Sequence, residues 1–213
     1  MEIELTESVD HAAPQRVGRR ALIGVGVGGA AVSLLPFLSG RAGATTADGT
    51  TTTVPPRRPT ATDAELLGTA QQVELTAREL YDTALGLTGW SAAETSVVVT
   101  VREAHEAFAQ SLSGLLGVSA PRTADDALLR SLSGTFAGTP STALKAAYQL
   151  ESALVATHLE LLGQLQGTDG AALLASVITS EGRQTTVLAE LAALTDESEL
   201  LVDHEAAPLV GQG

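Results

Sequence analysis

The sequence predicts an all-α fold, an up-down bundle of four helices with a long connection between the second and the third. In four segments between residues 62 and 194, apolar residues recur at alternating steps of three and four, the spacing of a packed helical seam. Aromatic residues make up only 3% of the chain, so Ala, Leu and Val must form the core. That composition favours close-packed helices over sheets, where aromatic and β-branched residues are enriched.

The first helix is defined by a capping signal and an apolar stripe, and the second by its apolar stripe. Thr62 and Glu65 have the spacing of a capping box, so the first helix is expected to run from about 62 to 87. The second is expected from about Ser91 to Gly117. The stripes are Leu67, Ala70, Glu74, Ala77, Tyr81 and Ala84 in the first helix, and Val98, Val101, His105, Phe108, Leu112 and Leu115 in the second.

A connection of about twenty residues follows, and one short helix is expected around Ala127–Leu129. The third helix is expected from about 141 to 166 and the fourth from about 170 to 194. The tight turn between them makes these two helices antiparallel neighbours. Their stripes are Leu144, Ala147, Glu151, Leu154, His158, Leu161 and Leu165, then Leu174, Val177, Glu181, Gln184, Leu188 and Leu191.

Four polar residues interrupt these stripes near the midpoints of the four helices: Glu74, His105, Glu151 and Glu181. A buried carboxylate or imidazole is costly unless it is paired or bound to something. Because the helices are of similar length, the four side chains should meet at mid-bundle, and four-helix bundles build metal sites in this way. Taken singly, each Glu could instead lie at the edge of the seam, and His105 could be a neutral core residue with a backbone partner.

Three stretches resemble the ferritin-like superfamily, in particular its exported bacterial ferritin-like domain proteins. They are QQVELTARELYDTAL, LESALVATHLELLGQL and ITSEGRQTTVLAEL, within a resemblance that covers 62–194. Such domains use one Glu from each of the first and third helices and a Glu-x-x-His from each of the others. The resemblance therefore implies metal ligands at Glu74, His105, Glu151 and Glu181, with iron or manganese as the metal.

Both Glu-x-x-His elements depart from this pattern, because Arg102 stands three residues before His105 and Gln184 three after Glu181. Two functions stay open. In one, the four ligands hold iron or manganese for metal handling or for ferroxidase or peroxide chemistry. In the other, Arg102 forms an internal ion pair with a Glu, and the protein is a metal-free scaffold or interaction protein of the cell envelope. The alternative for Arg102 is a solvated position at the flank of its helix.

Two further residues lie one heptad beyond the candidate ligands and could face the same space. His158 follows Glu151 and Tyr81 follows Glu74. His158 would restore a ligand if the metal lies lower in the bundle; the alternative for it is a neutral core histidine.

The N-terminus indicates export. Arg19 and Arg20 precede an uncharged run over 21–40, and Ala42-Gly43-Ala44 is a small-x-small cleavage pattern, so 1–44 resembles a twin-arginine-type signal peptide. An uncleaved membrane anchor is the competing interpretation. Residues 45–61 are expected to be a Thr/Pro-rich disordered linker, 62–195 the bundle, and 196–213 an acidic tail from which Leu200, Leu201 and Val202 could dock.

Composition limits the partners. The chain has no cysteine, which excludes disulfides and thiolate metal sites. Its net charge of −13 argues against nucleic acid, whose phosphates require clustered Lys and Arg. A metal ion is the one ligand that the residues suggest, and a membrane would be contacted only through the signal segment if it is uncleaved.

Overall fold

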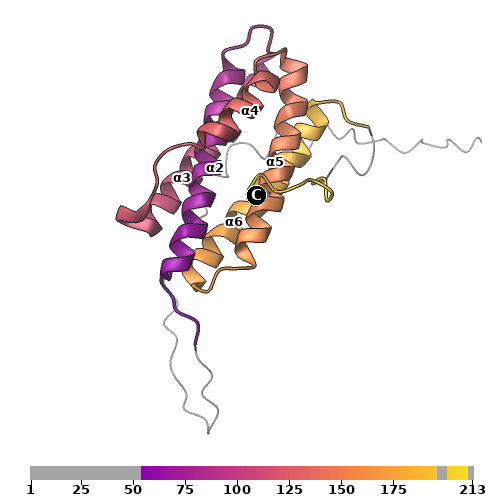
Figure 1. The fold of residues 1–213 in the computed structure, drawn as a ribbon. Helices are drawn as coiled ribbons and strands as arrows, with labels where there is room; N and C mark the ends of the chain where they lie inside the picture. Colours follow the sequence, from indigo (N-terminus) through magenta and orange to yellow (C-terminus); the bar gives the residue numbers. More distant parts are fainter. Residues whose placement is uncertain (1–53, 196–200, 211–213) are drawn as a thin grey trace, which may run out of the picture. The chain divides into compact units, whose positions relative to one another are not determined.

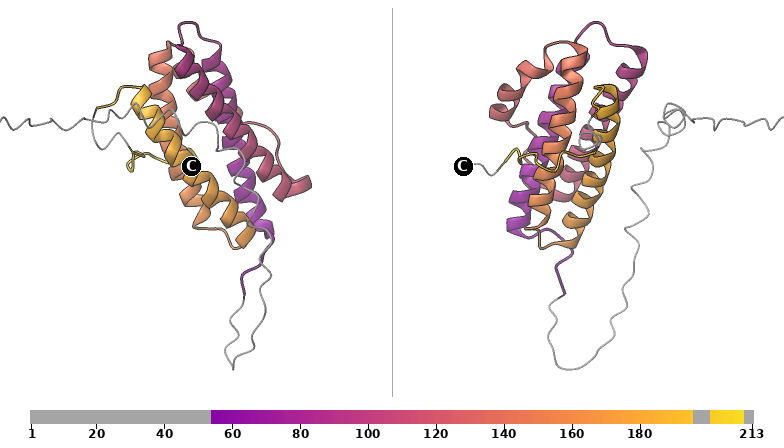
Figure 2. Two further views of the ribbon diagram at one scale, coloured as in Figure 1. Left: turned by 180° about the vertical axis from the view of Figure 1, so that it is seen from behind. Right: turned by 90° about the vertical axis from the view of Figure 1, so that its right-hand side faces the viewer.

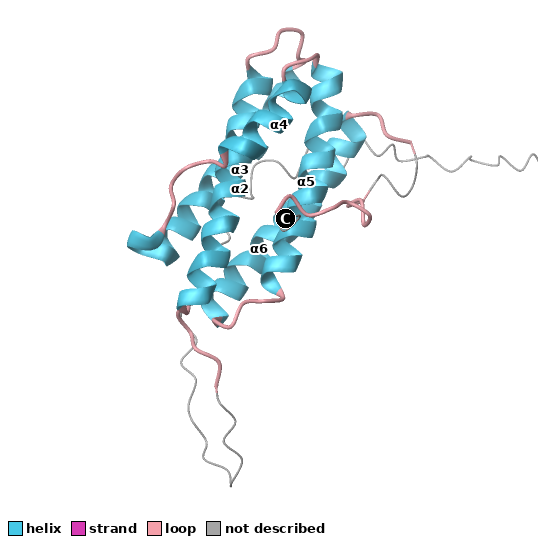
Figure 3. Ribbon diagram, viewed as in Figure 1, coloured by secondary structure: helices cyan, strands magenta, loops and turns pink. Residues whose placement is uncertain are grey.

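The computed structural model describes residues 54–195 and 201–210, and within them the protein is all-helical with no strand (Figure 3). The elements are α2 (Ala61–Leu85), α3 (Ala92–Leu116), the 3-10 turn η2 (Gly117–Ser119), α4 (Asp126–Phe136), α5 (Pro140–Leu162) and α6 (Thr168–Leu191). The predicted all-α class is confirmed. None of the described helices combines the length and the apolar character that a membrane span requires. The predicted signal peptide 1–44, residues 45–53 of the predicted linker and Leu200 lie outside the described residues.

The four long helices form two antiparallel pairs. α2 packs along α3 and α5 along α6, and the pairs meet through contacts of α2 with α5 and of α3 with α6 (Figure 1). The connection between α3 and α5 returns along the bundle to the end where α5 begins, in both views of Figure 2. Its short helix α4 packs on α2 and α5. The long connection and its one short α-helix are as predicted.

The start of α2 differs from the prediction by two residues. The N-cap is Thr60 rather than Thr62: Asp63 N donates to Thr60 Oγ1 at 3.1 Å, and Thr60 N donates to Asp63 Oδ2 at 2.8 Å. Asp63 also accepts hydrogen bonds from the backbone N–H groups of Gln166 and Gly167, at 2.8 and 2.9 Å. These contacts tie the start of α2 to the α5–α6 turn, so tertiary partners favour Asp63 over Glu65 at the third helical position.

A polar layer divides the core into two apolar clusters. The smaller cluster contains Leu67, Ala70, Leu112, Leu116, Leu161 and Leu174. The larger includes Val73, Ala77, Leu80, Val101, Leu154 and Leu188, together with Phe136 from α4. Glu74 and His105 each stand between residues of the two clusters in their own helix. The apolar stripes thus bury both halves of the bundle and bring the interrupting polar residues to one level between them.

The C-terminal segment, defined here as residues 201–210, crosses the outer face of α5 (Figure 1). Tyr148 donates its hydroxyl to Leu201 O at 3.1 Å, and Asp203 N donates to Ser152 Oγ at 3.2 Å. Leu209 N donates to Thr157 Oγ1 at 2.8 Å, and the Leu209 side chain packs against the larger apolar cluster. Ser152 immediately follows Glu151 in the chain, and Thr157 immediately precedes His158.

Candidate metal centre

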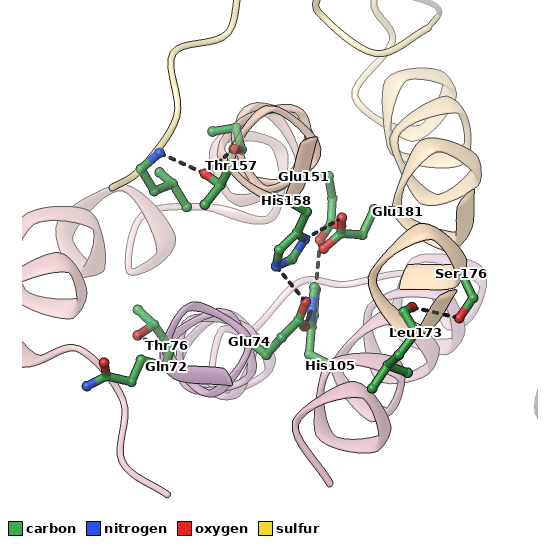
Figure 4. Close-up of polar contacts among 12 residues, drawn as sticks. Gln72, Glu74, Thr76, His105, Glu151, Thr157, His158, Leu173, Ser176 and Glu181 are labelled. Carbon is green, nitrogen blue, oxygen red and sulfur yellow. Dashed lines mark hydrogen bonds and ion pairs between the residues drawn. The ribbon is translucent and has the colours of Figure 1, made fainter. Parts of the chain in front are cut away.

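Five buried side chains converge at mid-bundle. Glu74 comes from α2, His105 from α3, Glu151 and His158 from α5, and Glu181 from α6 (Figure 4). All five have no exposed surface. The structure thus brings together the four residues singled out from the stripes and adds His158, while their role as metal ligands stays a prediction.

The carboxylates and imidazoles alternate along one chain of contacts. His105 lies between two carboxylates, with Nδ1 2.7 Å from Glu74 Oε2 and Nε2 2.9 Å from Glu151 Oε1. His158 lies between another two, with Nδ1 3.0 Å from Glu181 Oε2 and Nε2 3.4 Å from Glu74 Oε1. Each imidazole is therefore flanked by opposite charge on both sides, which favours its protonated form when no metal is bound.

Tyr81 holds one end of this chain. Its hydroxyl donates to Glu151 Oε1 at 2.7 Å, and its ring stacks on His105 with 5.4 Å between centroids. Phe136 of α4 packs edge-on against the same ring at 5.9 Å. Burial, and then the charge of Glu151, raise the pKa of Tyr81 well above its usual value, so the phenol stays a hydrogen-bond donor.

Burial and charge compete in setting the protonation of the cluster. Burial lowers the pKa of His105, but Glu151 and Glu74 outweigh it and hold that pKa well above the usual value. For His158 burial again lowers the pKa, and Glu181 and Glu74 raise it overall. Burial raises the pKa of Glu74, with His105 opposing. Without a metal, the raised pKa values of His105 and His158 favour protons on atoms that a metal ion would need.

Several donor atoms of the cluster have no hydrogen-bond partner. They are Glu74 Oε1, Glu151 Oε2, His158 Nε2 and Glu181 Oε1, all buried. Buried polar atoms are normally satisfied, and a bound ion is one way to satisfy them. Glu74, His105 and Glu181 also each offer one donor atom within 4.8 Å of the others. This buried cluster of carboxylate and imidazole donors could hold a metal ion.

Comparison with known proteins agrees with this geometry. The ferritin-like domain family matches residues 62–194. The chain belongs to this family. Searches of curated proteins and of solved structures gave no match. The ferritin-like assignment therefore rests on the family match together with the helical arrangement.

Arg102 departs from the ferritin-like pattern without entering the site. Its Nε donates to Asp82 Oδ1 at 2.9 Å, and its Nη1 pairs with Glu106. Asp82 raises the pKa of Arg102, and the side chain of Arg102 remains 24% exposed. The predicted internal ion pair with Glu74, Glu151 or Glu181 is therefore wrong. A partly exposed carboxylate pair satisfies the guanidinium without the cost of desolvating it, and His105 and His158 take the internal positions instead.

Gln184 is the second departure from the ferritin-like pattern. Its Oε1 is buried without a hydrogen-bond partner. An amide oxygen is a weaker metal ligand than the imidazole that this position holds in the family pattern. The imidazole that does enter the interior is His158, which contacts Glu181 from α5. The sequence signal for it was its place in the same apolar stripe as Glu151.

Proposed function

We propose that this ferritin-like protein binds iron or manganese in the buried Glu/His cluster. The observation that carries the proposal is the set of buried carboxylate and imidazole atoms without a hydrogen-bond partner that meet there from three helices. Such atoms cost free energy in the metal-free protein, and a cation would satisfy them together. Carboxylate and imidazole donors without thiolates suit iron and manganese better than softer metals.

The residues around the cluster would have different roles in holding a metal ion. Glu74, His105, Glu151 and Glu181 would supply donors, and Tyr81, which stacks on His105 and donates to Glu151, would fix the orientation of the His105 ring. The apolar clusters on both sides keep water away from the cluster. A bound iron or manganese ion would supply redox chemistry, which is the basis for proposing metal handling or protection against oxidants as the role.

We further propose that the protein works outside the cytoplasm. The support is the twin-arginine-like order over 1–44: paired arginines, an uncharged run and a small-x-small site. Replacement of Arg19 and Arg20 by Lys should abolish export, which immunoblotting of cell fractions would measure. N-terminal sequencing of the exported form should begin near residue 45. A protein that starts at Met1 in every fraction would contradict cleavage.

A metal-free scaffold of the cell envelope is the second candidate function. It is favoured by one observation, that His105 has a carboxylate on each ring nitrogen. Protons could then satisfy much of the layer without a metal. The acidic exterior would supply the interaction surface in this case.

Metal content separates the two candidates. The protein would be produced as the full chain, purified without chelators after aerobic and iron-supplemented growth, and analysed by elemental mass spectrometry. The proposal expects near-stoichiometric iron or manganese, lost in Glu74→Ala and in Glu181→Ala. Glu190→Ala is the matched control, because Glu190 is exposed on the same helix as Glu181. Folded protein without metal under every condition would favour the scaffold.

A further inference from the structure

We propose that the cluster binds one metal ion rather than two, and that His158 is a ligand in place of the histidine that is absent at position 184. This inference rests on the proposed metal-binding function and specifies its site. Three observations support the inference: the number of buried charges, the spacing of the donor atoms and the position of His158.

The buried charges balance one ion but not two. Glu74, Glu151 and Glu181 are the only acidic side chains buried in the polar layer of the described chain. The other buried acid, Asp63, lies at the start of α2 and is occupied by backbone donors. One divalent or trivalent ion would leave a net charge of about −1 or zero in the interior. Two divalent ions would leave about +1, and the described residues offer no further buried carboxylate in this layer to compensate it.

The spacing of the donor atoms also favours a single ion. Ligand atoms that share one ion lie about 2.1 Å from it and hence at most about 4.2 Å apart. The donors of Glu74, His105 and Glu181 lie within 4.8 Å of one another, so a small inward shift brings these three onto a single ion. His158 is not in this group of three and adjoins it through Glu74 and Glu181. A second ion would need further donors at position 102, where the family pattern has a Glu. Arg102 there is turned to Asp82 and Glu106, away from the cluster.

His158 is placed between two of these donors. Its Nδ1 is 3.0 Å from Glu181 Oε2, and its Nε2 is 3.4 Å from Glu74 Oε1 without forming a hydrogen bond. With its Nδ1–H donating to the Glu181 carboxylate, a neutral imidazole presents the lone pair of Nε2 toward Glu74. A carboxylate on one ring nitrogen is the usual way in which a protein orients a histidine ligand. Figure 4 shows the ring directed at Glu74 and Glu181.

The test is a titration of the metal-free protein with Mn²⁺ alone, read by calorimetry and by electron paramagnetic resonance. The inference expects one Mn²⁺ per chain and the hyperfine pattern of an isolated ion. His158→Gln should weaken Mn²⁺ binding by about tenfold or more. Gln184→Ala should change the affinity by less than about twofold, because it removes no ligand of this site. Circular dichroism would establish that each variant is folded.

The outcomes are distinguishable. Two ions with a spin-coupled signal would overturn the single-ion site while leaving the proposed function intact. One ion with unchanged affinity in folded His158→Gln would overturn the role of His158. The wild-type stoichiometry and spectrum decide the ion count even if the variant does not fold. No bound Mn²⁺, together with no metal in the protein as isolated, would overturn the proposed function itself.

Discussion

Arg102 occupies the position where the ferritin-like pattern has a metal-binding Glu, yet its guanidinium lies at the surface between Asp82 and Glu106. Partly exposed ion pairs contribute little to stability, because water screens them and ordering the side chains costs entropy. Arg102→Ala should therefore lower the free energy of unfolding by about 1 kcal/mol or less. Urea denaturation would measure it. A loss of about 3 kcal/mol or more would instead mean that Arg102 compensates a buried carboxylate.

At the scale of single residues, the sequence predicted which residues face the interior better than it predicted where a long side chain points. Glu74, His105, Glu151 and Glu181 could be identified because each interrupts an apolar stripe, and a stripe faces the interior. The direction of Arg102 could not be predicted, since its long side chain can leave the helix edge toward either side. The role of Ser152 and Thr157 as acceptors for the C-terminal segment could not be predicted, because hydroxyl residues within helices usually bond to their own backbone.

The beginning of α2 depends on the charge of Asp63, which is buried and accepts hydrogen bonds from three backbone N–H groups. Asp63→Ala should lower the free energy of unfolding by about 2–3 kcal/mol, because it removes a cap and the partner of the α5–α6 turn. The exposed Glu65→Ala is the control. Chemical denaturation would measure both, and equal small losses would contradict the role of Asp63.

The sign of the pH effect at Asp63 follows from its pKa. Burial opposes ionisation of Asp63, but the N–H donors of Gln166, Thr60 and Gly167 outweigh burial and lower its pKa. The contribution of Asp63 to the free energy of unfolding is therefore complete above the pKa of aspartate in the unfolded chain, about 3.9. It is lost as the pH falls through the pKa of Asp63 in the folded protein. The difference between wild type and Asp63→Ala should shrink in that acid range.

The attachment of the C-terminal segment to α5 can be tested at Thr157. Thr157→Val keeps the shape of the side chain but leaves the N–H of Leu209 without its acceptor, and should cost about 1–2 kcal/mol. Thr186→Val is the matched control, because the Thr186 hydroxyl is exposed and bonds only within α6. Hydrogen exchange would show whether residues 201–210 lose protection in Thr157→Val alone. Equal protection in both variants would contradict the attachment.

At the scale of elements, boundaries were predictable where local chemistry decides them. α3 begins next to Ser91, where the second helix was expected to start, and Ser91 forms a capping box with Glu94. The start of α2 was misplaced because Asp63 has partners in the α5–α6 turn, more than one hundred residues away in the sequence. Long-range contacts of this kind leave no periodic pattern in the chain, and the course of residues 201–210 has the same origin.

For the molecule as a whole, the polar layer predicts how the stability of the metal-free protein depends on pH. The pKa values of His105 and His158 are raised by their carboxylate neighbours. Their contribution to the free energy of unfolding is therefore complete below the pKa of histidine in the unfolded chain, about 6.5. It is lost as the pH rises through the pKa values of the folded protein. Chelator-treated protein should thus lose stability above about pH 6.5, as measured by the urea midpoint.

The control for this pH effect is the double variant His105→Gln, His158→Gln. Other titrating groups act in both proteins, so the difference in urea midpoint between them isolates the two histidines. That difference should fall with rising pH. A difference that grows with pH would contradict protonated histidines in the folded protein.

The fold class was predictable because one pattern, four stripes with steps of three and four, recurs between residues 62 and 194. Low aromatic content and the long second connection narrowed it to one arrangement. The packing of α4 on α2 and α5 was not predictable, since its few apolar residues do not specify which helices they cover.

The complete burial of the cluster has a consequence for kinetics. Because none of its five side chains has exposed surface, an ion could enter or leave only when helices separate locally. The residence time of a metal would then follow the frequency of such opening events rather than the strength of each ligand bond. A metal acquired where the chain folds would be carried to wherever the protein resides, so the compartment of folding would select which metal is found in it.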